Sequence, residues 1–530
     1  MKKTVISFIL TASLSVSAFS PTDTAKLSIS KETPEQKLLL LRKALETAET
    51  PSIKRSILLH MIARTGTFIG LVTAGKYLDD ADNSVRQAAA QAVCTIASDH
   101  PEYYGAEVTA LLNTAVAVSK DPGCQKEAVQ KHLAALPKDE GFVSMFNGKD
   151  LTGWKGLVED PVKRGKMTPE ELAGRQRKAD EIMRRDWHVA DGILVFDGPA
   201  YDNLCSEKMY GDFEMYVDWK IAAKGDAGIY LRGSPQVQIW DVPEKGSGGL
   251  FNNNNHPKDP LVVADNPVNE WNSFYIKMIG EKVTVYLNGI LVVDNVVFEN
   301  YWDRSIPVFP KEAIELQAHG ERVEYRDVYI REIPRPEPYE VSASEKADGF
   351  VPLFNGTDMT GWTGNFNDYS ARDGMIVCDP PAGSYSNLYT DREYSDFIIR
   401  FEFQLTPAAN NGLGIRAALH GAGMELQILD SEADVYANLA AYQYHGSVYG
   451  LIPARRGFLK PAGEWNHQEV IVDGYRIKVT LNGTVILDGD IAEASNHSHP
   501  MLSVKRGHIA FLGHDSKVSF RNLRIKDLSE

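Results

Sequence analysis

The chain has 530 residues, of which 43% are hydrophobic and 24% are charged, and these values predict a globular protein of more than one domain. Its formal net charge of −15 at pH 7 argues against nucleic-acid binding, which requires a basic surface. Its four cysteines are too few for a disulfide framework and lack the spacing of a metal site.

Residues 1–18 resemble a secretory signal peptide. Lys2-Lys3 gives a positive start, a mostly apolar run follows from Val5 to Leu14, and Val16-Ser-Ala18 resembles a small-residue cleavage site. No cysteine follows that site, so we expect no lipid anchor, and no later segment is long and apolar enough for membrane insertion. We therefore expect a periplasmic or secreted protein.

Apolar residues recur with a helical period between residues 33 and 137, and the segment Asp82–Val93 resembles the start of a HEAT-type helix. The pattern predicts a small α-helical HEAT-like domain, which serves either as a spacer or as a module that docks a protein partner. Cys94 and Cys124 lie in this domain. In an oxidising compartment they form a disulfide, and two buried thiols are the alternative.

From Gly141 onwards the pattern changes to short alternating strands. The stretch Gly141–Trp154 recurs as Gly349–Trp362 with ten identities in fourteen positions and no gap, which indicates a duplication. Each copy has about 180–200 residues with turns rich in Gly, Asn and Asp, and this composition predicts an antiparallel β-sandwich. We place the first sandwich at 141–333 and the second at 349–530.

The first copy carries a charged segment, Lys155 to Arg185, that the second copy lacks. Pro169-Glu-Glu-Leu has the residue types of a helix start. The segment either covers one end of the first sandwich or is a surface excursion.

Both copies contain two adjacent strands joined by a short turn. In the second copy the alternation of side chains places Gly412, Gly414 and Arg416 on one face, and Glu425 and Gln427 also share a face. Glycine weakens a strand unless something approaches its backbone closely. We therefore predict that this face binds a ligand; a solvated outer face is the alternative.

The corresponding face of the first copy is also polar and aromatic. It carries Tyr230 and Arg232 on one strand and Gln236, Gln238 and Trp240 on the next. We expect these five side chains to contact the ligand of the first copy.

Four motifs of the second copy together resemble the 3-keto-disaccharide hydrolase domain family. They are Gly-Phe-x-x-Leu-Phe-Asn-Gly-x-Asp-x-Thr-Gly-Trp at 349–362, Glu-x-Gln-Ile-Leu-Asp at 425–430, Glu-Trp-Asn at 464–466 and Phe-Arg-Asn-x-x-Ile at 520–525. The resemblance implies a mainly β protein with two tandem concanavalin-like jelly rolls after the helical domain. It also implies a carbohydrate-active hydrolase that cleaves glycosides already oxidised to a ketone at C3.

Such a reaction removes the C2 proton, eliminates the C1 substituent and adds water, so it requires a base, an enolate stabiliser and an acid. Glu425 is the best candidate for the base, and Gln427 accompanies it. Arg416 holds the developing oxyanion or tunes Glu425; a structural ion pair is the alternative. Asp430 either reaches the site or caps a turn.

Histidines add candidates for acid or base. His445 and Tyr444 lie in a loop rich in aromatic residues and glycine, which suits sugar stacking, and His514 precedes the last strand. For each of these residues, a purely structural role is the alternative.

The first copy departs from this pattern because Gln236 stands at the position of Glu425, and an amide cannot act as a general base. Asp241 and His319 remain as its candidate catalytic groups. The first copy is therefore either a binding site or a catalytic site that uses these two residues.

A divalent cation, Ca²⁺ or Mn²⁺, held by Asp, Glu and His would suit enolate stabilisation, although no spacing identifies its ligands. We expect no organic cofactor. The alternative to an enzyme is a non-catalytic carbohydrate-binding protein whose helical domain docks a partner.

Overall fold

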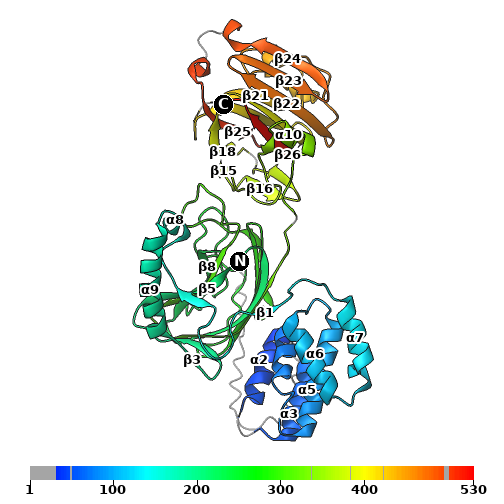
Figure 1. The fold of residues 1–530 in the computed structure, drawn as a ribbon, viewed down its shortest axis with the longest axis vertical. Helices are drawn as coiled ribbons and strands as arrows, with labels where there is room; N and C mark the ends of the chain where they lie inside the picture. Colours follow the sequence, from blue (N-terminus) through cyan, green and yellow to red (C-terminus); the bar gives the residue numbers. More distant parts are fainter. Residues whose placement is uncertain are drawn as a thin grey trace, which may run out of the picture. The chain divides into compact units, whose positions relative to one another are not determined.

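The computed structural model describes residues 31–47, 50–335, 337–381, 383–421, 423–494 and 500–529. The predicted signal peptide lies outside these residues. None of the described helices is long and apolar enough to cross a membrane. The chain forms one helical unit and a second unit that contains two β-sandwiches (Figure 1).

The helical region is confirmed. Its elements are α2 (Pro34–Leu45), α3 (Ser52–Ala63), α4 (Phe68–Gly75), α5 (Asn83–Asp99), α6 (Ala106–Val118), η1 (Pro122–Cys124) and α7 (Lys126–Ala135). Asp82 caps α5 by accepting a hydrogen bond from the backbone N–H of Ser84. The alanines of α5 are buried, which allows the neighbouring helices to pack closely on it.

Cys94 and Cys124 form a disulfide with a Cα–Cα distance of 5.5 Å. The bond links α5 to η1, whereas Cys205 and Cys378 are buried free thiols. The structure therefore decides between the two alternatives for this pair.

The first sandwich consists of two antiparallel sheets. Its larger sheet has the order β11-β10-β9-β6-β13-β4-β3, and its five-stranded sheet has the order β2-β5-β12-β7-β8. The strands of the five-stranded sheet are β2 (Trp154–Gly156), β5 (Tyr201–Tyr210), β12 (Glu312–His319), β7 (Asp226–Leu231) and β8 (Ser234–Trp240). Those of the larger sheet are β1 (Val143–Ser144), which pairs with β13, β3 (Trp187–Ala190), β4 (Ile193–Phe196), β6 (Phe213–Ile221), β9 (Asn272–Ile279), β10 (Lys282–Leu287), β11 (Ile290–Val297) and β13 (Val323–Glu332).

The second sandwich repeats this topology strand for strand. After α10 (Ala343–Ala347), its larger sheet contains β14 (Val351–Pro352), β16 (Tyr369–Arg372), β17 (Met375–Cys378), β19 (Phe397–Leu405), β22 (Trp465–Asp473), β23 (Arg476–Leu481), β24 (Thr484–Asp490) and β26 (Val518–Asp527). Its five-stranded sheet has the order β15-β18-β25-β20-β21, with β15 (Trp362–Gly364), β18 (Ser386–Tyr394), β25 (Gly507–Gly513), β20 (Asn410–Ala417) and β21 (Met424–Leu429). Short η turns follow at Asp434–Tyr436, Ala441–Gln443, Ile491–Glu493 and Pro500–Ser503.

Local sequence explains the turns and the core. Asn482 and Gly483 both have positive φ, as a two-residue hairpin between β23 and β24 requires. Alternate residues of the strands, such as Leu413, Leu426 and Phe511, are fully buried between the two sheets. The intervening residues of the five-stranded sheet therefore point to its outer face, away from the core.

The charged insertion of the first sandwich is not a free excursion. Its helix α9 (Pro169–Asp186) packs along β2, where Gln176 donates to the carbonyl of Gly156 at 2.9 Å. The short α8 (Pro161–Arg164) reaches the start of the central strand β12, where Arg164 pairs with Glu312 at 3.2 Å. Helix α9 also contacts β5 and β3, and Figure 1 shows α8 and α9 on one side of the first sandwich. The second sandwich has no such cover, because β15 is followed by only four residues before β16.

The contribution of the disulfide to stability can be tested. Because it closes a loop across a sequence separation of 30 residues, its loss should lower the unfolding free energy of the helical unit by about 3 kcal/mol. Urea unfolding of the double variant Cys94→Ser/Cys124→Ser, followed by far-UV circular dichroism, measures this. Dithiothreitol should destabilise the wild type equally and leave the double variant unchanged; equal stability of oxidised and reduced wild type would contradict the prediction.

Candidate functional site

The outer face of each five-stranded sheet carries three rows of cross-strand neighbours, which we call the rim, middle and inner rows. In the first sandwich the rim row is Tyr201, His319, Asp226 and Trp240, the middle row is Asn203, Gln317, Gly228 and Gln238, and the inner row is Cys205, Glu315, Tyr230 and Gln236. In the second sandwich the same rows are Tyr385, His514, Asn410 and Leu429; Asn387, Leu512, Gly412 and Gln427; and Tyr389, Ala510, Gly414 and Glu425.

Glu425 lies in the inner row of the second sandwich and is only partly exposed. Its Oε1 is buried and finds no hydrogen-bond donor within the described part of the chain. Burial, with no opposing charge, raises the pKa of Glu425 to about 7. A carboxylate with this pKa exchanges protons readily at neutral pH, which is what a general base requires.

The glycines of the middle row have a different explanation from the one we expected. A Cβ at Gly412 would collide with the carboxylate of Glu425, and a Cβ at Gly228 would collide with the amide of Gln236. The neighbouring side chain, rather than a ligand, therefore occupies the space above each glycine. In both sandwiches the edge-strand side chain leans onto the sheet through this gap.

Glu315 is a second carboxylate, in the inner row of the first sandwich, that the sequence analysis missed. It is 1% exposed, accepts a hydrogen bond from Nδ2 of Asn203 at 2.7 Å, and has its pKa raised to about 7 by burial. The alternation Glu315, Gln317, His319 along β12 was a signal that could have placed it on the same face as the other candidates.

The inner rows of the two copies differ by a reciprocal exchange. The first sandwich has Glu315 and Tyr230 where the second has Ala510 and Gly414. Conversely, the first has an amide where the second has Glu425. Each inner row therefore keeps one carboxylate, but on a different strand.

The rim rows pair a tyrosine with a histidine in both copies. The rings of Tyr201 and His319 meet edge to face with centroids 5.6 Å apart, and those of Tyr385 and His514 do so at 5.2 Å. Tyr201 is 45% exposed and Tyr385 is 73% exposed, so both offer a ring to a ligand. Burial lowers the pKa of His514, which favours its neutral form.

His319 also reaches a carboxylate of its own sandwich. Its Nδ1 is 3.5 Å from Oδ2 of Asp226, whose Oδ1 accepts from Nε2 of Gln238 at 2.7 Å. Gln427 makes the equivalent contact in the second sandwich, donating to Asn410 at 2.7 Å. These glutamines are therefore already oriented on the outer faces where the sequence placed them.

Arg416 does not contact Glu425, contrary to our expectation. Its guanidinium bonds Asp396 at 2.9 Å and the carbonyls of Ser395 and Gly474. It is 4% exposed and ends β20 with a positive φ, which turns its side chain away from the outer face. The structural ion pair is therefore the correct alternative, with a different partner.

Arg232 is arranged in the same way in the first sandwich. It is 1% exposed, lies 3.5 Å from Asp212 and donates to the carbonyls of Pro310 and Gly280. Both arginines fasten a hairpin to the loops behind it, although Nε of Arg232 is buried without an acceptor among the described residues.

Asp241 and Asp430 cap turns. Asp241 accepts from the backbone N–H of Lys224 and Asp430 from that of Ala408, both at 2.8 Å. Because each carboxylate holds the turn that precedes the glycine-bearing strand, of the two alternatives for Asp430 the turn cap is the one the structure shows.

His445 and Tyr444 belong to the interior rather than to a sugar platform. His445 is 4% exposed, stacks on Phe403 and bonds Gln468 through Nε2 at 3.0 Å. Burial lowers its pKa to about 4, so it is neutral at pH 7. Tyr444 is 5% exposed and lies under the guanidinium of Arg456.

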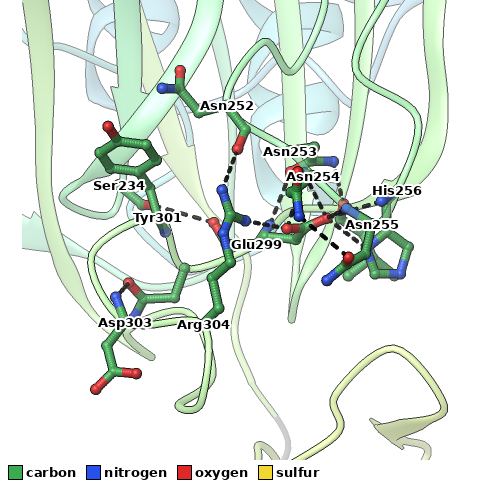
Figure 2. Close-up of polar contacts among 12 residues, drawn as sticks. Ser234, Asn252, Asn253, Asn254, Asn255, His256, Glu299, Tyr301, Asp303 and Arg304 are labelled. Carbon is green, nitrogen blue, oxygen red and sulfur yellow. Dashed lines mark hydrogen bonds and ion pairs between the residues drawn. The ribbon is translucent and has the colours of Figure 1, made fainter.

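Trp240 and the loop beyond it are held by hydrogen bonds. Trp240 donates through Nε1 to the carbonyl of Gly246 at 2.7 Å and is partly buried. Figure 2 shows the next loop, where Glu299 accepts the backbone N–H groups of residues 254–256 and pairs with His256 and Arg304. Because its partners saturate it, Glu299 is an anchor for this loop.

The side chains do not identify a cation site. Within the described ranges, no three His, Cys, Asp or Glu residues lie close enough together to hold a metal ion. A cation site built mainly from these side chains is therefore absent from the described part of both outer faces.

The buried histidine His445 predicts how the stability of the second sandwich depends on pH. His445 has an ordinary pKa of 6.5 when unfolded and about 4 when folded, so the unfolded chain binds its proton first. The second sandwich should lose about 3 kcal/mol of stability as pH falls from about 6.5 to about 4. Urea unfolding of wild type and His445→Gln at pH 7.5 and 4.5 measures the share due to this residue; an identical pH dependence in both would contradict the prediction.

Comparison with known protein families finds two matches along the chain. The family described as the 3-keto-alpha-glucoside-1,2-lyase-like domain matches residues 141–331 and 349–526. These segments correspond to the two sandwiches. The 3-keto-disaccharide hydrolase of Bacteroides thetaiotaomicron is 23% identical over an alignment of 230 positions, which covers 34% of this chain and 79% of that protein.

Solved structures resemble single sandwiches. A protein of Parabacteroides distasonis, provisionally named a glycosyl hydrolase, is 24% identical, with a TM-score of 0.33, and the match covers 37% of this chain and 100% of that one. The carbohydrate binding module CBM66 of Bacillus subtilis is 13% identical, with a TM-score of 0.24 and coverage of 31% and 96%.

Proposed function

The chain belongs to the family of 3-keto-alpha-glucoside-1,2-lyase-like domains, and from this premise we propose that it cleaves α-glycosides that carry a ketone at C3. The observation that supports this most is the carboxylate of Glu425. It lies on the outer face of its sheet, with a pKa of about 7 and no opposing charge to hold it ionised.

In the proposed reaction Glu425 takes the C2 proton, which the neighbouring ketone makes acidic. The electron pair of the C–H bond forms an enolate and then the C1–C2 double bond, while the C1–O bond breaks and the aglycone leaves with a proton. Water adds to C1 and Glu425 returns its proton to C2. The net reaction is hydrolysis of the glycosidic bond, with the base regenerated.

The second sandwich supplies suitable partners for this chemistry. Gln427 lies two residues from Glu425 on β21; one N–H of its amide donates to Asn410, and the other is proposed to donate to an enolate oxygen. Tyr385 and His514 lie at the open rim, where a sugar ring stacks on the tyrosine and the histidine exchanges a proton with the leaving group. All these residues belong to one sheet face.

We assign the chemistry to the second sandwich because its glutamate is partly exposed as a residue, although Oε1 is buried. Glu425 is partly exposed beside Ala510 and Gly414, whereas Glu315 is 1% exposed beneath its neighbours. A base must come within hydrogen-bond distance of the proton it removes. The alternative, a non-catalytic carbohydrate-binding protein, would bind a keto-glycoside without turnover.

We further propose that the protein acts in the periplasm or outside the cell, because the Cys94–Cys124 disulfide persists in an oxidising compartment. The helical unit remains a candidate for docking a protein partner. A fractionation of cells with antibody detection, compared with a cytoplasmic marker protein, tests the location.

Replacement of the base should abolish turnover. Glu425→Gln keeps the size of the side chain but cannot accept the C2 proton, so kcat for release of 4-nitrophenol from a 4-nitrophenyl 3-keto-α-glucoside should fall about 10²–10⁴-fold. The matched control is Glu315→Gln, which changes the carboxylate of the other sandwich. Loss of activity only in Glu315→Gln would move the chemistry to the first sandwich, and no release by wild type would favour the binding protein.

The pH profile reports the same group. Because the base must be ionised, kcat/KM should fall about tenfold per pH unit below about 7 and level off above it. Initial rates between pH 5 and 9, with the aglycone detected by chromatography, measure this profile. A profile independent of pH between 5 and 8 would rule out Glu425 as the base.

A cation is tested separately. Since the described residues contain no cluster of three His, Cys, Asp or Glu side chains, we expect dialysis against EDTA to change kcat/KM less than twofold. Recovery of lost activity by Ca²⁺ or Mn²⁺, but not by Mg²⁺, would instead establish the expected divalent cation.

A further inference from the structure

A cavity of about 470 Å³ lies where the two sandwiches meet, within the compact unit that contains both of them. One wall comes from the first sandwich and includes His256 and Arg304. The other wall comes from the second sandwich and includes Asn367, Tyr385 and Tyr389. A volume of this size is within the range of sites that bind small molecules, so the cavity is a candidate ligand site.

Polar contacts join the two walls. Arg335, in the segment after the first sandwich, donates to Asp212 of that sandwich at 2.8 Å and to Asp358 of the second at 2.9 Å. The hydroxyl of Thr363 in β15 donates to the carbonyl of Ser305 at 2.7 Å. Ser305 lies between two residues that line the cavity and Thr363 lies next to a third, so this contact brings the walls together.

A difference in chain length between the two copies explains the space. In the first sandwich β2 is followed by the insertion Lys155 to Arg185, whose helix α9 packs along that strand. In the second, β15 is followed by only four residues before β16, and the loop that carries Ser305 approaches β15 instead. The first copy therefore covers the strand of the second sandwich that corresponds to the strand α9 covers in its own sheet.

The cavity reaches the outer face on which Glu425 lies. Tyr385, Asn387 and Tyr389 stand in the rim, middle and inner rows, and all three line the cavity. Glu425 is in the same inner row as Tyr389 but on β21, three strands away, or about 14 Å at the usual strand spacing. That span is longer than one sugar ring, so a ligand in the cavity is not the ring that reacts at Glu425.

The walls carry groups that suit a polyhydroxylated ligand. Asparagine amides both donate and accept hydrogen bonds, and the rings of Phe366 and Tyr385 offer apolar faces to a sugar. Glu299 is paired with Arg304, and burial raises the pKa of Glu281 to about 7, so the walls favour a neutral ligand over an ion. The asparagines that line the cavity are Asn255, Asn300, Asn365, Asn367 and Asn387.

The first wall is held by hydrogen bonds of the protein itself. Glu299 accepts the backbone N–H groups of residues 254–256, pairs with Arg304 and contacts Nδ1 of His256 (Figure 2). A wall that is already ordered lowers the entropy cost of binding a ligand. The loop is therefore suited to serve as a fixed surface of a site.

We propose that the cavity is a remote subsite of the second sandwich, and that the chain acts on keto-glycosides whose aglycone is an oligosaccharide. The unit that carries the ketone lies at Glu425, and the far end of the aglycone lies in the cavity, against the first sandwich. Between these two places the inner row carries only the small residues Ala510 and Gly414. The reaction itself rests on the proposed function, whereas the subsite rests on the cavity and its walls.

The inference gives the first copy a task in the site of the second. Its loop selects the length of the aglycone, because it forms the wall that only a long aglycone reaches. Binding energy from a remote part of the substrate raises kcat/KM when it is kept in the transition state. We therefore expect activity to rise with the length of the aglycone.

The test uses the full-length protein and two substrates with the same reacting bond, maltose and maltotetraose, each with a ketone at C3 of its non-reducing unit. Chromatography of the released sugars should give a kcat/KM about tenfold higher for the tetrasaccharide. Asn255→Trp fills the cavity from the first wall and should bring the ratio of the two values to about one. Asn367→Trp, in the second wall, should do the same.

The matched control is Asn254→Trp, since Asn254 is exposed on the same loop and does not line the cavity. It should leave the ratio at about ten, and thermal unfolding checks that each variant is folded. A ratio near one in the wild type, or a ratio unchanged in both Asn255→Trp and Asn367→Trp, would overturn the inference.

Binding of unoxidised maltotetraose to the wild type is measured in parallel by titration calorimetry and should weaken about tenfold in Asn255→Trp. Turnover of both keto-sugars with equal kcat/KM would overturn this inference alone. If neither is cleaved, the proposed function is overturned. Maltotetraose binding that Asn255→Trp weakens would then retain the cavity as a glycan site, and undetectable binding would overturn the inference as well.

Discussion

A carboxylate can lie flat on a β-sheet only where the neighbouring strand has no side chain in its way. Glu425 meets this condition because Gly412, its diagonal neighbour, has no Cβ, and Gly414 beside it is also bare. The gap lets the carboxylate settle against the backbone, where water is excluded and its pKa rises. The proposed chemistry depends on this packing, since a fully solvated glutamate would be too weak a base at neutral pH.

The same constraint explains how the two copies diverged. The first sandwich carries Gln236 on the edge strand β8, and its carboxylate, Glu315, lies in the same row two strands away on β12, with Tyr230 between them at the position of Gly414. Larger and smaller side chains exchange positions within the inner row of the two sandwiches, and both sheets keep the same strand register. The inner-row glutamate is therefore partly exposed in the second sandwich and buried in the first.

Electrostatics and access then separate the two sites. Burial, rather than a charged partner, is the main cause of the raised pKa of both glutamates. Of the two residues, Glu425 is partly exposed to solvent and Glu315 is buried. Glu315 is held by Asn203 and enclosed near α8. The two inner-row glutamates thus differ in exposure, although the sandwiches share strand order and the tyrosine–histidine pair of the rim row.

Several site residues were predictable because they depend on local pattern. Strand alternation placed Glu425, Gln427 and Gln238 on the outer faces, where the structure has them. Strand alternation gave the wrong direction for the side chain of Arg416. A positive φ at the end of its strand turns this side chain toward Asp396, and an alternation pattern does not reveal such a change in the backbone. It also could not show that His445 packs in the core, because the loop that carries it has no period.

The sequence by itself determined the duplication, the helical and β regions and the family, because each of these features depends on patterns within contiguous stretches of residues. The tertiary structure alone decided which polar groups meet. The carboxylate of Glu425 packs over Gly412 because their two strands pair side by side. Glu315 accepts a hydrogen bond from Asn203, 112 positions away in the chain, for the same reason. Burial, and with it the pKa of each carboxylate, follows from that pairing and has no local signature.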